Sequence, residues 1–542
     1  MKKKILFAVI SSLFIFTASG CKRHIRLKDQ VPTVEAVNKI GKFIKNVDLD
    51  FNDVSFKRIL EDAIEDIKGT SDEDAIYDIV YKVYLKTTEL VKKYYVAEAL
   101  YDYDRDNDEY YEKRELLSDA YYEYESFRAN LFYELKDNRE FLKNITGITS
   151  DEDLDYEINL AKKKKDEKYT NLKKEIDDII EEFDDLDISM SDSKNNAKIS
   201  EILFRFVNKN KELSEYLGFD SYVEYKDIMN RRIYTKYDTE NFIKYVKKYI
   251  LPELDSERNV LDIRSKINSL TSPEYNYLIE FIESSAYDKD YYTINLAKDY
   301  ARKMGGSYYK TFYSYLNEGH IILANNEAEL DSGYTNQYLS YFGSNYQDVD
   351  TIIHEFGHYY SINNGDALSK SLDLEEFYSQ GNEFLFMSYL EQNSYSNVKN
   401  VYDVVSSYKL VNACLTMFVG AALREYEEEI YSTEITSQTQ LVDIWSNLKE
   451  NEYDDLLADY WKYEVRYDNY YISYATSVTG ALSLYTYSKT DFTKAKEAYI
   501  SACRNENYDD DLVEVLTKNN LSNPFDEETF KKIVALIEEK RK

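Results

Sequence analysis

The sequence predicts an all-α, mainly helical protein. Residues that interrupt helices are scarce, with 4 Pro and 15 Gly among 542 residues, and these two types are the least favourable in helix interiors. Charged residues make up 31% of the chain, as the solvent-facing sides of helices require. Apolar residues also recur every three or four positions over long stretches, which is the period of one helix face. The length allows two or more hydrophobic cores, or one large multi-lobed helical fold.

Two apolar stripes in the first third of the chain predict long antiparallel helices. The first stripe consists of Ile76, Ile79, Val80, Val83 and Tyr84, and the second of Tyr169, Leu172, Ile176, Ile179 and Phe183. Such stripes are typical of core-facing positions. We therefore expect an N-terminal helical lobe over residues 34–190. The polar, turn-rich stretch around 189–196 marks its end, and residues 191–542 form the second domain.

The N-terminus has the pattern of a bacterial lipoprotein signal. Lys2 to Lys4 are basic, Ile5 to Phe16 are apolar, and Ala18-Ser19-Gly20-Cys21 forms a small-residue cleavage site. We expect a signal peptide over 1–20, a lipidated Cys21 and a polar tether over 21–33. An ordinary secretory signal or an uncleaved anchor is the alternative.

This signal sequence predicts a protein that works outside the cytoplasmic membrane, tethered to the bacterial cell membrane by lipid. We expect later segments to be too short or too polar to span a bilayer, so that the membrane is contacted through the lipid alone. The three cysteines, Cys21, Cys414 and Cys503, do not form a disulfide framework.

The charge balance argues against nucleic-acid binding. The chain carries 68 Lys and Arg against 101 Asp and Glu, a net charge of −33, and such a surface repels phosphate backbones. Cationic or neutral peptides would be favoured as ligands, although the same charge also serves solubility.

The most informative stretch is His354-Glu355-Phe356-Gly357-His358. On a helix, His354 and His358 lie one turn apart on the same face, where two imidazoles can bind one zinc ion. Glu355 points about 100° away, so it cannot bind the ion beside them but can reach a water molecule at the site. This is the HExxH pattern of zinc metallopeptidases. The chain has only 4 His, so the spacing is unlikely to arise by chance.

A catalytic zinc ion requires a third protein ligand. Glu376 lies 18 residues after His358 in a segment with helical periodicity, which leaves room for a turn and a returning helix. Glu383 is seven residues further and shares the same face. Spacing alone leaves Glu375 as a rival ligand, and His320 as a ligand or a structural histidine.

A small β element is expected just before the histidine helix. Residues 331–334 and 337–343 are punctuated by glycine and alternate in character, which favours short extended segments. Such a segment could form a plain hairpin, or it could pair with the backbone of a substrate by strand addition.

The histidine motif together with Glu376-Phe377-Tyr378-Ser379-Gln380-Gly381-Asn382-Glu383 resembles the oligopeptidase F and thimet oligopeptidase family of zinc peptidases. Further segments resemble oligopeptidase F, namely Leu217 to Tyr222, Asp331 to Tyr334, Phe342 to Ser344, Ala421 to Tyr431 and Tyr474 to Thr476. The resemblance covers residues 200–540 and extends to the N-terminal helices.

The resemblance implies two helical lobes that enclose a deep substrate channel. One Zn²⁺ per chain would lie on the channel floor, so that short unstructured peptides enter and folded proteins do not. It also implies Glu376 as the third ligand, with a second glutamate seven residues on. From its place on the same helix face, we expect Glu383 to accept a hydrogen bond from a ligand imidazole. We expect a monomer that binds oligopeptide substrates.

One late segment departs from the family pattern. The family carries a histidine and several tyrosines there, whereas residues 461–474 of this chain contain no histidine. Tyr467, Tyr470 and Tyr474 remain as donors to the developing oxyanion, with Tyr474 the first choice. Glu464 or Arg466 stands near the position of the missing histidine.

The sequence thus predicts a zinc-dependent oligoendopeptidase with Glu355 as general base, whose catalytic domain is expected over residues 191–542. The alternative is a lipid-anchored peptide-binding protein on the same fold, with weak or no catalysis because of the missing histidine. The complete set of ligand residues favours the enzyme. An adhesin or scaffold would explain the long N-terminal helices but not the ligand set.

Overall fold

The computed structural model describes most of the chain. The described residues are 40–146, 151–184, 186, 193–232, 234–254, 263–283, 292–324, 333–343, 347–364, 371–393, 399–453, 457, 459–504 and 510–541. The expected signal peptide, Cys21 and the tether lie outside these residues.

Two compact units make up the chain, and each is assembled from several segments. The first unit comprises Met1–Lys165, Leu278–Ser369 and Cys503–Tyr508, and the second comprises Asp166–Tyr277, Lys370–Ala502 and Asp509–Lys542. The expected boundary near residue 190 stays a prediction, since residues 187–192 are outside the described part.

The first unit combines a helical layer with a small sheet. Its helices in the described residues are α3 (Lys42–Lys45), α4 (Asp53–Lys68), α5 (Glu73–Tyr103), α6 (Asp108–Glu134), α7 (Arg139–Thr146), α8 (Asp151–Lys164), α16 (Tyr292–Met304), α17 (Gly306–Glu318) and α18 (Val349–Asn364). Its strands are β1 (Ile321–Leu323), β2 (Gly333–Thr335) and β3 (Ser340–Phe342).

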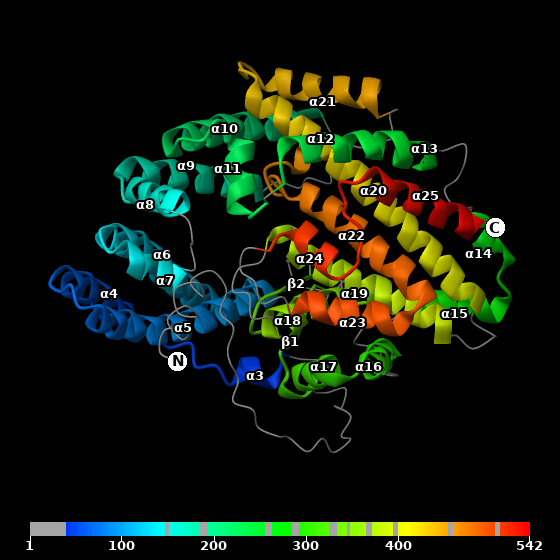
Figure 1. Cartoon of the computed structure of the whole chain (residues 1–542), viewed down its shortest axis with the longest axis horizontal. Coiled ribbons are helices and arrows are strands. Elements are labelled where there is room, and N and C mark those ends of the chain that lie inside the picture. Colours follow the sequence, from blue (N-terminus) through cyan, green and yellow to red (C-terminus); the bar gives the residue numbers. More distant parts are fainter. Residues whose placement is uncertain are drawn as a thin grey trace. The chain divides into compact units, whose positions relative to one another are not determined.

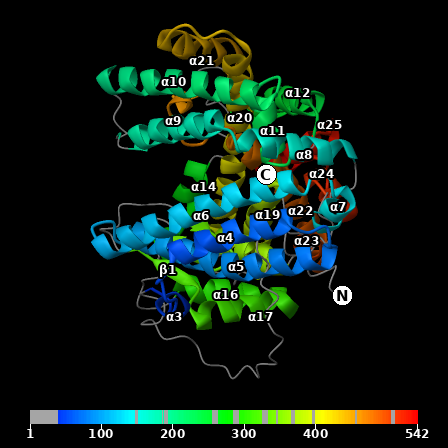
Figure 2. The same cartoon turned by 90° about the vertical axis from the view of Figure 1, so that its left-hand side faces the viewer.

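Helices α4, α5 and α6 pack side by side around an apolar core (Figure 2). Asn52, Asp72 and Asn107 cap their N-termini by accepting hydrogen bonds from the first-turn amides. The first predicted stripe is confirmed as core, because Ile76, Val80 and Val83 are buried there and Ile79 and Tyr84 pack against them.

The small sheet has the order β1-β3-β2, with β1 parallel and β2 antiparallel to β3. Both faces of β1 and β3 are buried, whereas β2 is partly exposed. The C-terminal part of α5 packs on the sheet through Val96, Ala99 and Leu100. The β element expected before the histidine helix is therefore present, and β1 is an additional strand.

The second unit is helical in the described residues. The elements that lie wholly or partly in it are α9 (Glu167–Asp184), α10 (Ser193–Leu217), α11 (Tyr222–Met229), α12 (Lys236–Tyr245), the π-helix η1 (Val246–Ile250), α13 (Leu251–Leu254), α14 (Ile263–Ser269), α15 (Ser272–Glu283), α19 (Leu372–Asn393), α20 (Lys399–Ser432), α21 (Gln438–Glu452), the 3₁₀ helix η2 (Tyr460–Tyr463), α22 (Tyr471–Thr490), α23 (Phe492–Cys503), α24 (Leu512–Lys518) and α25 (Glu527–Arg541).

Helices α9 and α10 pack as a pair (Figure 2). The second predicted stripe lies on α9, and its residues Leu172, Ile176, Ile179 and Phe183 are buried. The core of the second unit is formed by α19, α20 and α22, which run beside one another (Figure 1). Gly420 permits the close approach of α20 to α22, because a Cβ there would lie 2.5 Å from the Cβ of Ala475.

Helix α20 is long and apolar enough to cross a membrane by length and composition, contrary to the expectation that later segments are not. Within the structure, 67% of its apolar window is buried. Core helices commonly pass the same test, and α20 packs against α19, α21 and α22.

Candidate metal centre

The two histidines of the HExxH motif lie on α18 of the first unit. Asp348 caps this helix by accepting hydrogen bonds from the amides of Asp350 (2.8 Å) and Thr351 (3.0 Å). The i, i+4 spacing places His354 and His358 on one face, where their Nε2 atoms are 3.2 Å apart. The two imidazoles therefore point toward a common position.

The opposite face of α18 is anchored in an aromatic core. Phe356 is fully buried, with ring centroids 5.0 Å from Tyr308, 4.7 Å from Phe312 and 5.3 Å from Tyr315. All three partners lie on α17. This packing fixes the rotation of α18 about its axis, and with it the direction of the histidine face.

Glu376 lies on α19 of the second unit and is 2% exposed. Ser371 caps α19, because its hydroxyl accepts a hydrogen bond from the amide of Leu374 (3.2 Å). The hydroxyl of Tyr470 donates to Glu376 Oε1 at 2.5 Å, and Ser379 Oγ lies 3.5 Å from Oε2. The carboxylate is thus held by Tyr470, while the hydroxyl of Ser379 donates to the backbone carbonyl of Glu376 at 2.9 Å.

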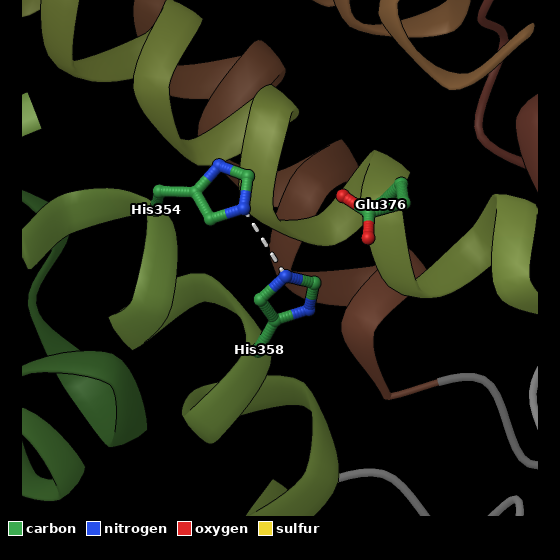
Figure 3. A group of neighbouring side chains, drawn as sticks. All are labelled: His354, His358 and Glu376. Atoms are coloured by element: carbon green, nitrogen blue, oxygen red, sulfur yellow. Dashed lines mark hydrogen bonds between the residues drawn. The ribbon is translucent and has the colours of Figure 1, made fainter. Parts of the chain in front are cut away.

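His354, His358 and Glu376 each offer one ligand atom, and these atoms all lie within 4.8 Å of one another (Figure 3). Glu375, the rival ligand that spacing left open, is not in this group. Two imidazoles and one carboxylate are the donor set of many catalytic zinc sites. Two nitrogens bound to one tetrahedral zinc ion at its usual distance lie about 3.3 Å apart, and the 3.2 Å between the two Nε2 atoms fits that geometry.

Glu355 is buried, at 4% exposure, against strand β2. Its Oε2 accepts a hydrogen bond from Thr335 Oγ1 at 2.7 Å. A Cβ on Gly333 would lie 3.0 Å from Glu355 Oε1, so the missing side chain at that position makes room for the carboxylate. Helix α18 therefore carries His354 and His358 on one face. On the adjacent face it carries Glu355, which is supported by Thr335 of β2.

Glu383 forms an ion pair with Lys409, and both side chains are largely buried. The hydrogen bond from a ligand imidazole to Glu383 stays a prediction.

His320, the other histidine considered as a ligand, is not in the triad. It stacks on Phe43, with ring centroids 4.2 Å apart, and its Nδ1 lies 2.6 Å from the carbonyl oxygen of Tyr338. These contacts are those of a structural histidine.

The three late tyrosines differ in their surroundings. Burial raises the pKa of Tyr470, and the charge of Glu376 beside it adds to the effect, so its hydroxyl keeps its proton. The ring of Tyr474 lies 5.0 Å from that of Tyr470. Tyr467 is 38% exposed. Their roles as oxyanion donors stay predictions.

Three acidic side chains, Glu427, Glu464 and Asp468, lie close together near the late tyrosines. Glu464 is 2% exposed, and burial, with the nearby charges of Glu427 and Asp468, raises the pKa of its carboxyl well above the usual range. The backbone amide of Asn469 donates to Glu427 Oε1 at 2.9 Å. Glu464 and Asp468 lie shortly before Tyr470 in the chain, whereas Glu427 lies on α20.

Sequence reasoning did not identify a buried arginine that braces both the ligand helix and the tyrosine segment. Arg232 donates from Nε to Asp373 (3.3 Å), which lies one turn before Glu376 on α19. Its guanidinium also donates to the carbonyl oxygen of Asn469 (2.6 Å) and the hydroxyl of Ser473 (2.7 Å). The sequence did contain one signal for this support. Asp373 precedes Glu376 by three residues, which is the separation of neighbours on one helix face.

Comparison with known proteins gives a consistent result at the level of structure. No family model matches the sequence, and no curated protein matches it. A structure described as a candidate oligoendopeptidase F superimposes with a TM-score of 0.68 at 13% identity, covering 92% of this chain and 98% of that one.

Two other solved structures extend this result. PZ peptidase A with an inhibitor has a TM-score of 0.62 at 15% identity, with 92% and 98% of the chains covered. Oligoendopeptidase F from Enterococcus faecium has a TM-score of 0.55 at 15% identity, with 90% and 96% covered. The chain therefore has the mainly helical fold of the oligoendopeptidase F and PZ peptidase structures.

Proposed function

We propose that this protein is a zinc-dependent metallopeptidase that hydrolyses short, unstructured peptides. The observation that carries the proposal is the triad of His354, His358 and Glu376, whose ligand atoms lie within 4.8 Å of one another. The fold shared with oligoendopeptidase F structures supports it. So does Glu355, because a protein that only bound peptides would have no need of an acid placed beside the histidines.

In this proposal His354, His358 and Glu376 hold one zinc ion. Zinc at such a site supplies Lewis-acid chemistry, polarising a carbonyl and making water more acidic. Glu355 takes one proton from the attacking water as its oxygen adds to the peptide carbonyl. The carboxyl of Glu355 then gives that proton to the leaving amine nitrogen as the C–N bond breaks.

The hydroxyl groups of the late segment serve the oxyanion in this scheme. Tyr474 is the first choice for this donor, because the hydroxyl of Tyr470 already donates to Glu376. Tyr467 is the remaining candidate. Glu464, near the position of the family histidine, is buried and supplies no cationic donor, because a carboxyl group carries no positive charge.

We further propose that the enzyme acts outside the cytoplasmic membrane, anchored by lipid on Cys21. The basic, apolar and small-residue regions before Cys21 support this location. The net charge of −33 favours neutral or cationic oligopeptides over nucleic acids as partners.

The experiment that tests the function uses the protein without its first 21 residues. Zinc content is measured, and a mixed library of short peptides is offered with and without a chelator. We expect about one zinc per chain and chelator-sensitive cleavage. Substituting a ligand residue should remove both the zinc and the cleavage. Glu355→Gln should keep zinc and abolish turnover. Bound zinc without cleavage of any peptide would favour the peptide-binding protein, and a protein that takes up no zinc would rule out the site.

A further inference from the structure

Strand β2 presents two different faces, because successive side chains of a strand point to opposite sides. Gly333 and Thr335 face α18 and contact Glu355. Tyr334, between them, faces α5 and donates a hydrogen bond to Asp102 at 3.0 Å. All of these residues belong to the first unit. The strand thus joins the N-terminal helices to the acid that is the general base in the proposed function.

The direction of the hydrogen bonds on the α18 side follows from chemistry. The hydroxyl of Thr335 donates its proton from Oγ1 to Glu355 Oε2 at 2.7 Å. Having one proton, Thr335 must then accept from the hydroxyl of Ser340, which lies 2.6 Å away on β3 and is fully buried. A hydroxyl that accepts one hydrogen bond is polarised and becomes a stronger donor.

The space beside the carboxylate is also shaped by β2. A Cβ at Gly333 would lie 3.0 Å from Glu355 Oε1 and 3.2 Å from Thr351 Cγ2, both closer than ordinary van der Waals contact. Thr335 therefore fixes one carboxylate oxygen, and the bare Gly333 accommodates the other.

The opposite face of β2 is held as firmly. The ring of Tyr334 stacks on that of its cross-strand partner Tyr341, with centroids 5.2 Å apart. Both tyrosines donate to Asp102, Tyr334 to the carboxylate and Tyr341 to the backbone carbonyl, each at 3.0 Å. Asp102 lies in the last turn of α5. Strand β2 is consequently fixed from behind while Thr335 supports Glu355 in front.

We propose that Thr335 is a positioning residue for Glu355: its hydroxyl, polarised by Ser340, holds the carboxylate in the orientation that general-base action requires. The inference rests on the proposed function. A hydrogen bond to a charged group restricts both the rotamer and the direction of the carboxylate. Small displacements of a catalytic group lower the rate of the chemical step more than they weaken substrate binding.

The test compares Thr335→Val with Thr335→Ser in the zinc-loaded protein. Valine keeps the shape and removes the hydroxyl, whereas serine keeps the hydroxyl. We expect Thr335→Val to lower kcat about 10- to 100-fold, the range that loss of one charged hydrogen bond gives. KM, zinc content and melting temperature should stay near those of the wild type, and Thr335→Ser should retain kcat within about 3-fold.

The matched control is Thr311→Val. Thr311 also exchanges hydrogen bonds with a residue of α18, because its Oγ1 lies within 3.1 to 3.4 Å of the side-chain atoms of Asn364, but this contact is ten residues beyond His354. The control variant should therefore keep wild-type kcat.

A second arm combines Thr335→Val with Glu355→Gln. If Thr335 acts through Glu355, the double variant should have the same residual turnover as Glu355→Gln alone. Equal kcat in Thr335→Val and wild type would overturn the inference, and so would a loss of activity that Thr335→Ser fails to restore. A wild-type protein without chelator-sensitive cleavage would instead overturn the proposed function, and the inference with it.

Discussion

Tyr470 donates a hydrogen bond to Glu376 across 94 positions of sequence, with 2.5 Å between the hydroxyl and Oε1. Both groups are largely buried, and both belong to the second unit. A hydroxyl in this position orients the carboxylate and stabilises its ionised form, which is the form that binds a metal. Tyr470, one of the three candidate oxyanion donors, therefore also contacts the candidate third metal ligand.

Replacing Tyr470 by Phe should weaken zinc binding. The change removes the hydroxyl and leaves the ring in place, so Glu376 loses its donor without a large cavity. Loss of a partner that orients a ligand typically lowers metal affinity about 10- to 100-fold. Competition with a zinc-binding dye measures the affinity without reference to peptidase activity. Tyr467→Phe is the matched control, because Tyr467 is 38% exposed, and equal affinities in the two variants would contradict the prediction.

Glu376→Gln should abolish stoichiometric zinc binding, and Glu375→Gln should not. The two residues are adjacent on α19, yet Glu376 is buried in the triad and Glu375 is outside it. An amide is a poor zinc ligand, because zinc prefers imidazole, thiolate and carboxylate donors. Metal content after gel filtration measures the difference. If both variants kept one zinc per chain, the third ligand would have to be sought elsewhere.

Much of the fold was accessible from the sequence, because helical periodicity is a local signal. Val80 and Val83 are buried on α5, and Ile176 and Ile179 on α9, as their spacing predicts. The paired histidines are equally local, since their relation depends only on one turn of α18.

The supports of the site were not accessible in this way. Periodicity tells which face of an element a residue occupies, but not which distant segment packs against that face. Thr335 reaches Glu355 across 20 positions, and Arg232 reaches Asp373 across 141. Such pairs depend on chain topology, and one sequence gives no measure of it.

Gly333→Ala should lower kcat by at least about 10-fold, the order of loss expected when a catalytic group is displaced. The added methyl group would lie 3.0 Å from Glu355 Oε1 and 3.2 Å from Thr351 Cγ2, so the carboxylate must move. Zinc content should be unchanged, because the histidines face another direction. Gly69→Ala is a suitable control, since its nearest neighbour would lie at 3.4 Å. Wild-type kcat in Gly333→Ala would show that the carboxylate tolerates the displacement.

The neighbouring acids Glu427, Glu464 and Asp468 predict that stability depends on pH. Burial raises the pKa of Glu427 to about 8, and the charge of Asp468 adds to it although Arg424 opposes it. The folded protein then keeps a proton that the unfolded chain has released, so this contribution to stability is complete below pH 4.5 and declines as the pH rises through 8. Glu427→Gln mimics the protonated acid.

The measurement is the melting temperature of wild type and Glu427→Gln between pH 4.5 and 9. The difference between the two curves isolates Glu427 from the other titrating groups. We expect the variant to gain relative stability as the pH rises from 5 to 8. A constant difference across this range would mean that Glu427 is ionised in the folded protein.

Arg232→Met should destabilise the second unit by about 3–5 kcal/mol, the usual consequence of removing one member of a buried ion pair. The Arg232 side chain is fully buried, and its partner Asp373 is 1% exposed, so the substitution leaves a carboxylate in a dry environment. Arg302→Met is the control, because Arg302 pairs with Asp299 where both side chains are about half exposed, and such pairs contribute at most about 1 kcal/mol. Denaturant titration compares the two.

Zinc affinity should fall as well in Arg232→Met, because Arg232 supports both α19 before Glu376 and the segment that presents Tyr470. A variant of Arg232 with wild-type stability and wild-type zinc affinity would show that the network is dispensable for the site.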